Sequence, residues 1–210
     1  MHPDTSKVSQ HMYQFGCCTL GRAVVDAVFS EMSKPFAHAS SITLAAHAAE
    51  IIVKARIAEE HPLLIFDALP KSTSTTDMLS IKELFEYGKT IMYSELPERL
   101  WAATGYRMKD VKKFIDFGKL RNTIMHFAVP NKELATETLK FAFEVIDPML
   151  QDFWQDSIIE YTEMWDDIVA SEGYLLDQLK RCDIQIHKDT LEEINEKMSW
   201  MRRDNAESED

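Results

Sequence analysis

Apolar residues in this 210-residue chain recur with a period near 3.6 residues, which is the spacing along one face of an α-helix. The clearest stripe runs from Ile42 to Ile57, with apolar residues three and four positions apart. Sustained two-residue alternation, the pattern of a half-buried strand, does not occur in the sequence. The pattern therefore predicts an all-α protein, with helices over residues 20–32, 42–61, 80–93, 97–103, 109–127, 132–165 and from 190 onward.

Prolines and capping residues predict where these helices begin and end. A proline cannot continue the hydrogen bonds of a helix, and one follows each of three periodic segments: Pro35, Pro62 and Pro130. Ser40 or Ser41 can cap the helix that carries the stripe, and Thr190 with Glu193 has the spacing of a capping box.

Length and composition fit one compact domain in three sections. A chain of this length that is 45% hydrophobic can bury a core without disulfides or a structural metal. Residues 1–37 form a predicted N-terminal helical segment, and residues 38–155 form the core bundle. Residues 156–210 form a predicted acidic C-terminal helical extension with a frayed tail.

Several classes of protein are excluded by what the sequence lacks. It has no run of 18 apolar residues, so we expect no membrane partner, and its first residues lack a signal-peptide pattern. The three cysteines show no Cys-x-x-Cys spacing, which predicts a reduced, cytoplasmic protein without a zinc site. A glycine-rich phosphate loop is absent as well, and we expect no cofactor and no metal.

The charge of the chain is distributed unevenly. The net charge of −12 argues at first against a nucleic-acid partner. Residues 1–130, however, hold 15 basic and 14 acidic residues, whereas residues 131–210 hold 8 and 21. Residues 107–121 hold six basic residues against two acidic ones. This segment supplies candidate RNA-binding residues, which are Arg107, Lys109, Lys112, Lys113 and Lys119.

A candidate catalytic set lies at the end of the same predicted helix. Around a helix axis, Arg121, Asn122 and His126 lie at roughly 0°, 100° and 140°, so they share one half of the surface. Asn122 and His126 are also close enough in spacing to form a hydrogen bond. A histidine transfers protons near neutral pH and a guanidinium holds phosphate, which together can cut RNA without a metal. The alternative is a surface arginine and a histidine packed at a helix end.

The residues from Arg121 to His126 resemble the signature of the HEPN superfamily, named for higher eukaryote and prokaryote nucleotide-binding domains. That signature is an arginine, a polar residue, three further residues and a histidine, near the end of a long helix. The segment from Leu44 to Phe66 is similar to the first core helix of many bacterial members. The resemblance covers residues 38–155, and it leaves both ends of the chain unexplained.

This resemblance implies an up-down helical bundle, here with N- and C-terminal helical extensions, and a homodimer whose motif helices face each other. It also implies a metal-independent endoribonuclease, often a toxin or an antiviral effector. Arg121 and His126 then take the catalytic roles, and Asn122 supports the histidine or contacts the phosphate. RNA is the implied partner, together with a protein antitoxin or partner subunit.

Three points stay open at this level. Members paired with a nucleotidyltransferase antitoxin carry a tyrosine four residues after the histidine, where this chain has Pro130, which argues against that pairing. Other members are non-catalytic modules that bind a nucleotide or a protein partner, and this is the alternative function. Glu50, at the border of the apolar stripe, either orients Arg121 or His126 from a supporting position, or it only pairs with a lysine. That lysine is Lys54, one helical turn further on.

Overall fold

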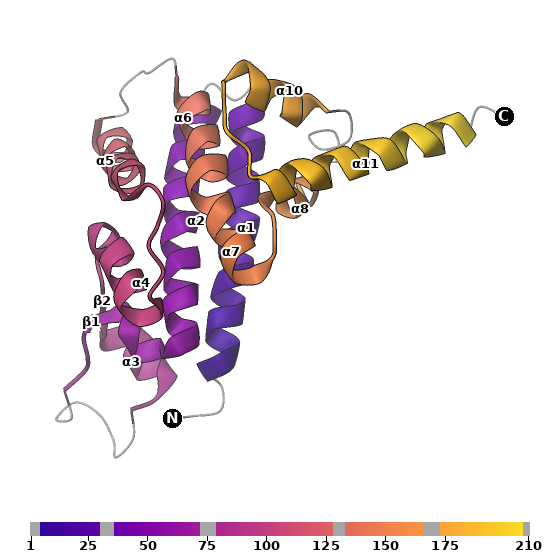
Figure 1. Ribbon diagram of the computed structural model, residues 1–210. Coiled ribbons are helices and arrows are strands. Elements are labelled where there is room, and N and C mark those ends of the chain that lie inside the picture. Colours follow the sequence, from indigo (N-terminus) through magenta and orange to yellow (C-terminus); the bar gives the residue numbers. More distant parts are fainter. Residues whose placement is uncertain (1–4, 30–35, 72–78, 128–132, 166–172, 208–210) are drawn as a thin grey trace.

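The computed structural model describes residues 5–29, 36–71, 79–127, 133–165 and 173–207, and it consists mostly of helices (Figure 1). The long helices α1 (Thr5–Val28) and α2 (Ala37–Glu60) run antiparallel at its centre. Buried residues form one hydrophobic core that extends from Cys17 in α1 to Ile194 near the C-terminus. Within the described ranges, no helix combines the length and the apolar character needed to cross a bilayer.

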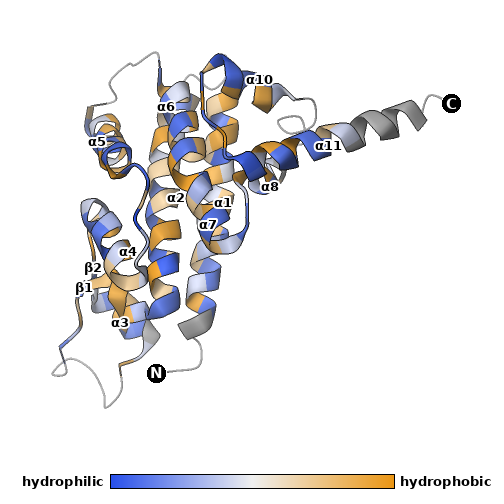
Figure 2. Cartoon of the chain, in the orientation of Figure 1, coloured by the Kyte–Doolittle hydropathy of each residue, from blue (hydrophilic) through white to orange (hydrophobic). Residues whose placement is uncertain are grey.

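Helix α2 is the central element of the bundle. The predicted stripe from Ile42 to Ile57 is buried, as expected. Ala48, Ala55 and Ala58, on other sides of the helix, are buried too, because α2 contacts α1 and three further helices. A helix that is apolar on most sides lies inside a protein, so α2 is a core helix rather than an amphipathic surface helix. Hydrophobic residues are frequent along it, whereas the C-terminal helix is mainly hydrophilic (Figure 2).

The start of α2 differs from the prediction. The helix begins at Ala37, so neither Ser40 nor Ser41 caps it. Ser41 is fully buried, and its hydroxyl forms a 2.8 Å hydrogen bond with the hydroxyl of Thr138 in a distant helix. The Ser41 hydroxyl therefore forms a buried contact between two helices instead of a cap, and the local sequence does not show that Thr138 lies beside it.

After α2, a short 3₁₀ turn, η1 (Pro62–Ile65), leads into a small two-stranded sheet that the sequence pattern did not predict. Strand β1 (Phe66–Ala68) pairs antiparallel with β2 (Lys89–Thr90). Strands of three and two residues are too short to show alternation. The predicted helix over 80–93 is correspondingly shorter and corresponds to α3 (Ile81–Tyr87), which starts with a capping box at Ser80. The polar composition of residues 71–77 is typical of a loop, and most of this segment lies outside the described residues.

The next elements lead to the motif helix. The turn η3 (Tyr93–Glu95) is followed by α4 (Leu96–Thr104), which ends at Gly105 with a positive φ of 77°. Glycine adopts this left-handed conformation without a steric penalty, and it ends α4 within one residue of the helix predicted over 97–103. Helix α5 (Val111–Phe127) begins two residues later than predicted, and the stop expected at Pro130 lies outside the described residues.

The predicted helix over 132–165 is in fact two separate pieces. A continuous helical rod consists of α6 (Leu134–Lys140), the π-helical turn η4 (Phe141–Ile146) and α7 (Asp147–Trp154). It ends at Gln155, whose φ of 53° breaks the helix, and α8 (Ile158–Glu163) follows. Helices α10 (Tyr174–Arg181) and α11 (Lys188–Glu207) complete the fold, and α11 extends away from the bundle (Figure 1).

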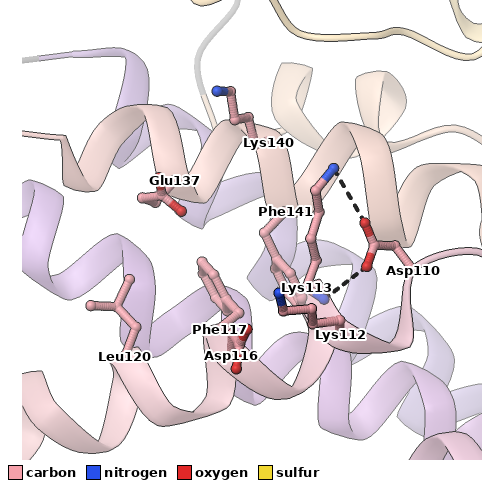
Figure 3. Close-up of a pocket in the computed structure, with 9 residues that line it drawn as sticks. All are labelled: Asp110, Lys112, Lys113, Asp116, Phe117, Leu120, Glu137, Lys140 and Phe141. Carbon is pink, nitrogen blue, oxygen red and sulfur yellow. Dashed lines mark hydrogen bonds and ion pairs between the residues drawn. The ribbon is translucent and has the colours of Figure 1, made fainter.

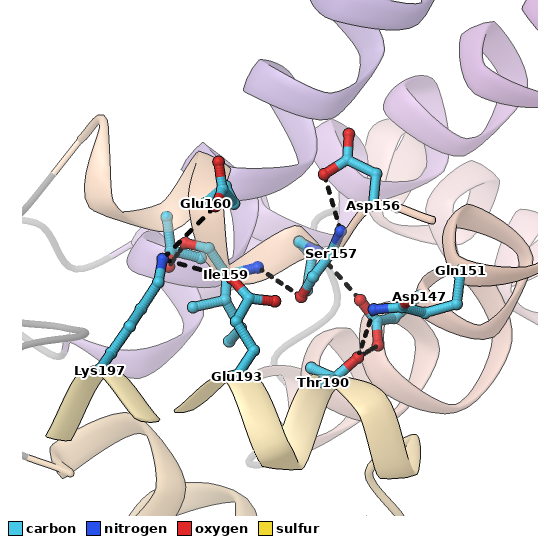
Figure 4. A network of polar contacts seen from close by, with 11 residues as sticks. Asp147, Gln151, Asp156, Ser157, Ile159, Glu160, Thr190, Glu193 and Lys197 are labelled. Atoms are coloured by element: carbon cyan, nitrogen blue, oxygen red, sulfur yellow. Dashed lines mark hydrogen bonds and ion pairs between the residues drawn. The ribbon is translucent and has the colours of Figure 1, made fainter. Parts of the chain in front are cut away.

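A buried carboxylate joins this C-terminal part to the rod. Asp147 is fully buried, and its side chain accepts hydrogen bonds from the backbone N–H of Ile158 at 3.0 Å and from the hydroxyl of Thr190 at 2.5 Å (Figure 4). The amide of Gln151 in turn donates to the Thr190 hydroxyl at 3.1 Å. Thr190 therefore lies inside α11 and contacts the rod, so the prediction that it caps this helix is wrong.

Burial raises the pKa of Asp147 to about 6, although its two hydrogen bonds and the neighbouring His187 act in the opposite direction. The folded protein thus holds a proton on this carboxyl at pH values where the unfolded chain, with a pKa of 3.8, has lost it. The resulting stabilisation is complete below pH 3.8 and is lost as the pH rises through about 6.

We expect Asp147→Asn to remove this pH dependence, because an amide retains an acceptor for Ile158 and carries no charge. Asp147→Ala leaves two buried donors without acceptors, and we expect it to lower the free energy of unfolding by about 2–3 kcal/mol. Urea unfolding at pH 4, 5, 6 and 7 measures both effects. Parallel pH profiles for the wild-type protein and Asp147→Asn would contradict the assignment.

Candidate functional site

Aromatic stacking holds α5 in place. The rings of Tyr93 and Phe114 stack at 4.4 Å, and those of Phe117 and Phe141 stack at 3.8 Å. These four residues, here called the aromatic cluster, connect α5 to η3 on one side and to the π-helical turn on the other. Offset and parallel ring contacts of this kind add stability beyond the burial of apolar area.

Gly118 allows α5 to approach Tyr93 closely. A Cβ atom at Gly118 would lie 2.5 Å from the Tyr93 ring, which is well inside van der Waals contact. The ring of Tyr93 thus packs flat on Phe114 and edge-on against Gly118, and the guanidinium of Arg121 lies 5.6 Å from its centroid. Residues from three successive turns of α5 therefore contact the ring of Tyr93.

A pocket of about 480 Å³ lies beside this contact. Glu50 of α2, together with Arg121 and Asn122 of α5, lines it, so three of the four predicted catalytic and supporting residues meet at one place. The remaining lining comes from α5 and from the segment between β2 and η3, and comprises Thr90, Ile91, Met92, Tyr93, Ser94, Ile115, Gly118 and Lys119.

Arg121 has unused hydrogen-bonding capacity in this pocket. Its Nε atom is buried and has no hydrogen-bond partner, and among the described residues no carboxylate lies within ion-pair distance of the guanidinium. Its contact with the Tyr93 ring is a cation–π interaction and uses none of its N–H donors. A buried donor without an acceptor is unfavourable, so this guanidinium is suited to an anionic ligand.

Glu50 is paired with a lysine rather than with Arg121. The Nζ atom of Lys54 donates to Glu50 Oε1 at 2.7 Å and to the hydroxyl of Thr90 at 3.2 Å. The side chain of Lys54 is only 8% exposed, and that of Glu50 is 23% exposed. Of the two possibilities considered for Glu50, the pairing with Lys54 is confirmed. Glu50 lines the same pocket as Arg121, but its role in orienting Arg121 or His126 stays a prediction.

His126 lies apart from this pocket. It is exposed, it does not line the cavity, and among the described residues no hydrogen bond joins it to Asn122. The helical geometry explains this position, because a rotation of roughly 140° separates His126 from Arg121, which faces inward. Met125 and Phe127 beside it are large apolar residues, yet they are 62% and 76% exposed.

The five candidate RNA-binding residues differ in how available their charges are. Lys113 pairs with Glu144 at 2.9 Å, and Lys119 pairs with Asp116 at 2.8 Å. The other three are exposed and have no ion pair within the described part of the chain; they are Arg107, Lys109 and Lys112. The Arg107 guanidinium lies over the ring of Trp101 at 4.8 Å.

A larger cavity of about 740 Å³ lies between α5 and the rod (Figure 3). Three lysines and three carboxylates line it, and Figure 3 shows Lys113 reaching toward Asp110. Opposite charges in equal number neutralise each other, so this groove offers a polyanion little attraction. The smaller pocket, with its unpaired Arg121, is the better candidate for binding phosphate.

The sequence did not identify two residues at this site: Tyr93, which lines the pocket, and Lys54, which binds two residues that line it. Tyr93 falls within a predicted helix, and no local pattern places it against α5. Its hydroxyl is buried without a hydrogen-bond partner, and burial raises its pKa, so it remains a neutral donor. Lys54 was noticed only as a possible partner of Glu50, because its burial and its contact with Thr90 depend on the tertiary fold.

Comparison with known proteins gives no relative whose site could be compared with this one. No family model, no curated protein and no solved structure matches the chain. In the ranges that the structure describes, no three His, Cys, Asp or Glu side chains gather as a potential metal site.

We expect Gly118→Ala to disturb the pocket. The added methyl group must displace the Tyr93 ring, and overpacking of this kind costs about 1–3 kcal/mol, of which the better helix propensity of alanine recovers about 1 kcal/mol. The expected result is a net loss of about 1 kcal/mol in the free energy of unfolding, together with weaker phosphate binding. Thr123→Ala serves as the control, because Thr123 is an exposed residue of the same helix and lies outside the pocket. Unchanged stability and unchanged binding would show that Tyr93 does not depend on this contact.

Proposed function

We propose that this protein is a metal-independent endoribonuclease of the HEPN type. The observation that carries the proposal is Arg121, a half-buried arginine without a carboxylate partner in the described chain, in a pocket with Asn122 and Glu50. The proposal is further supported by the arginine–asparagine–histidine pattern on α5 and by the free cations near the start of that helix.

The proposed reaction is an internal transesterification of RNA. The 2′-oxygen attacks the adjacent phosphorus, the bond from phosphorus to the 5′-oxygen breaks, and the products are a 2′,3′-cyclic phosphate and a 5′-hydroxyl. Arg121 binds the non-bridging oxygens and stabilises the charge that builds on phosphorus, while the Asn122 amide donates to the same group. His126 takes the proton from the 2′-hydroxyl or gives one to the leaving 5′-oxygen.

We further propose that the active form is a homodimer. In a single chain Arg121 faces the pocket and His126 faces outward, so the two do not surround one phosphate. If the motif helices of two copies face each other, the histidine of one copy can approach the pocket of the other. The exposed Met125 and Phe127 supply apolar surface beside His126 for such a contact.

One observation favours a second candidate function. His126 has no hydrogen bond within the described residues and lies outside the pocket, whereas phosphate binding by Arg121 needs only one chain. A non-catalytic module that binds a nucleotide, or a protein partner such as an antitoxin, agrees with this arrangement. Cleavage of RNA distinguishes it from the enzyme.

Cleavage is tested on single-stranded RNA in the presence of EDTA. We expect products with 2′,3′-cyclic phosphate ends, and losses of at least about 10²-fold in rate for both His126→Ala and Arg121→Ala, because each removes a group that acts in the transition state. Mass spectrometry identifies the ends, and gel analysis gives the rates.

His47→Ala and Arg181→Ala serve as matched controls, because both residues are exposed and lie outside the pocket. We expect these two variants to cleave at the wild-type rate. If the wild-type protein binds RNA but leaves it intact in EDTA and in Mg²⁺, the binding module is the correct function and the enzyme is not.

The dimer makes a separate prediction. Sedimentation at micromolar concentrations is expected to show a dimer, and Phe127→Asp is expected to weaken its association at least tenfold, because it places a charge in an apolar interface. Cleavage is expected to fall in parallel, while the free energy of unfolding of the monomer stays unchanged. A wild-type protein that is monomeric and still cleaves RNA would exclude a shared site.

A further inference from the structure

Lys54 is an unusual residue for the middle of a core helix. Its side chain is almost completely buried, and a buried ammonium group is costly unless it is paired and hydrogen-bonded. Its charge is satisfied by Glu50 at 2.7 Å and by the hydroxyl of Thr90 at 3.2 Å. Both partners line the pocket that contains Arg121.

The pairing of Glu50 with Lys54 has a consequence for Arg121. Glu50 and Arg121 line the same pocket, and opposite charges attract strongly where little water separates them. Among the described residues, however, Arg121 has no carboxylate within ion-pair distance, whereas the Oε1 atom of Glu50 is bound by Lys54. Lys54 lies one turn from Glu50 on the same helix, so its ammonium group is always close enough to bind this carboxylate in competition with Arg121.

We infer that Lys54 is a positioning residue that holds Glu50 away from Arg121 and so keeps the Arg121 guanidinium free for a phosphodiester group. The charges agree with this ligand. Glu50 and Lys54 cancel, Lys119 is paired with Asp116, and the buried Tyr93 is neutral. One unpaired positive charge remains, and a phosphodiester linkage carries one negative charge.

This inference rests on the proposed function, because RNA supplies the phosphodiester, but it can be tested without cleavage. The probe is a fluorescent 2′-O-methyl oligouridine, which lacks the 2′-hydroxyl that the reaction needs and therefore reports binding alone. Fluorescence anisotropy at a fixed salt concentration gives its dissociation constant for each variant.

We expect Lys54→Met to weaken probe binding about tenfold or more, because the released Glu50 carboxylate then pairs with Arg121. We expect the double variant Lys54→Met/Glu50→Gln to bind within about threefold of the wild-type protein, because it has no carboxylate left to occupy Arg121. A lysine with a purely structural role predicts no such rescue. In an Arg121→Met background, Lys54→Met is expected to have no effect on binding.

Arg56→Met is the matched control, because Arg56 forms an ion pair of the same spacing on the same helix, with Glu60 at 2.8 Å, and does not line the pocket. Its binding is expected to equal that of the wild-type protein. Circular dichroism and urea unfolding verify that each variant is folded, and the double variant, with its neutral pair, tests the proposal even where the single variant is less stable.

The outcomes separate this inference from the proposed function. Wild-type-like binding by Lys54→Met, or a folded double variant that binds as weakly as Lys54→Met, overturns the role of Lys54, whether or not the protein cleaves RNA. A wild-type protein that does not bind the probe overturns it as well. If the wild-type protein binds the probe and the rescue occurs, but RNA stays intact, the inference holds and the proposed enzyme fails.

Discussion

The position of the Tyr93 ring determines how α5 is oriented. The ring stacks on Phe114, its edge touches Gly118, and the Arg121 guanidinium lies over its face, so it contacts three successive turns of the helix. On the other flank, Phe117 stacks on the π-helical turn. A helix packed on both sides in this way can neither rotate nor shift by a residue without losing several aromatic contacts at once. The depth and direction of the Arg121 side chain follow from this packing.

The same packing explains why Arg121 and His126, the two ends of the motif, point in different directions. Once Arg121 is turned toward the pocket, helical geometry turns His126 roughly 140° away, toward solvent. Under the proposed function, a single chain binds a phosphate with Arg121 but cannot bring His126 to it, because the two side chains point in different directions. Catalysis, if the proposal holds, depends on a second copy of the chain, whereas simple binding does not. Under the proposal, oligomeric state and cleavage are therefore linked, because both depend on the different directions in which Arg121 and His126 point.

Local sequence patterns predicted the helical class, but they failed where a distant segment decided the outcome. Periodicity identified the buried stripe of α2 and placed α4 closely, whereas α1 begins at Thr5 rather than near residue 20. Ser41 and Thr190 were interpreted as caps, because local spacing cannot show that Thr138 and Asp147 approach them in the folded protein. The small sheet of β1 and β2 was missed for the same reason, since its strands are defined by their pairing rather than by their composition. In the site, the approach of Glu50 to Arg121 was considered, but the burial of Lys54 and Tyr93 was not.

Charge shows most clearly why position matters more than composition. The net charge of −12 describes the surface as a whole, and the basic segment at the start of α5 describes one stretch of sequence, but neither tells which cations are available to a ligand. Lys119 belongs to the basic segment and is already paired with Asp116, whereas Arg121 shares a pocket with a carboxylate and has no ion pair among the described residues. The difference arises because Lys54 competes for that carboxylate at short range, where Coulomb attraction is strong and poorly screened by salt. A protein of acidic overall charge can therefore offer phosphate a binding site wherever one buried pair leaves a neighbouring cation without a partner.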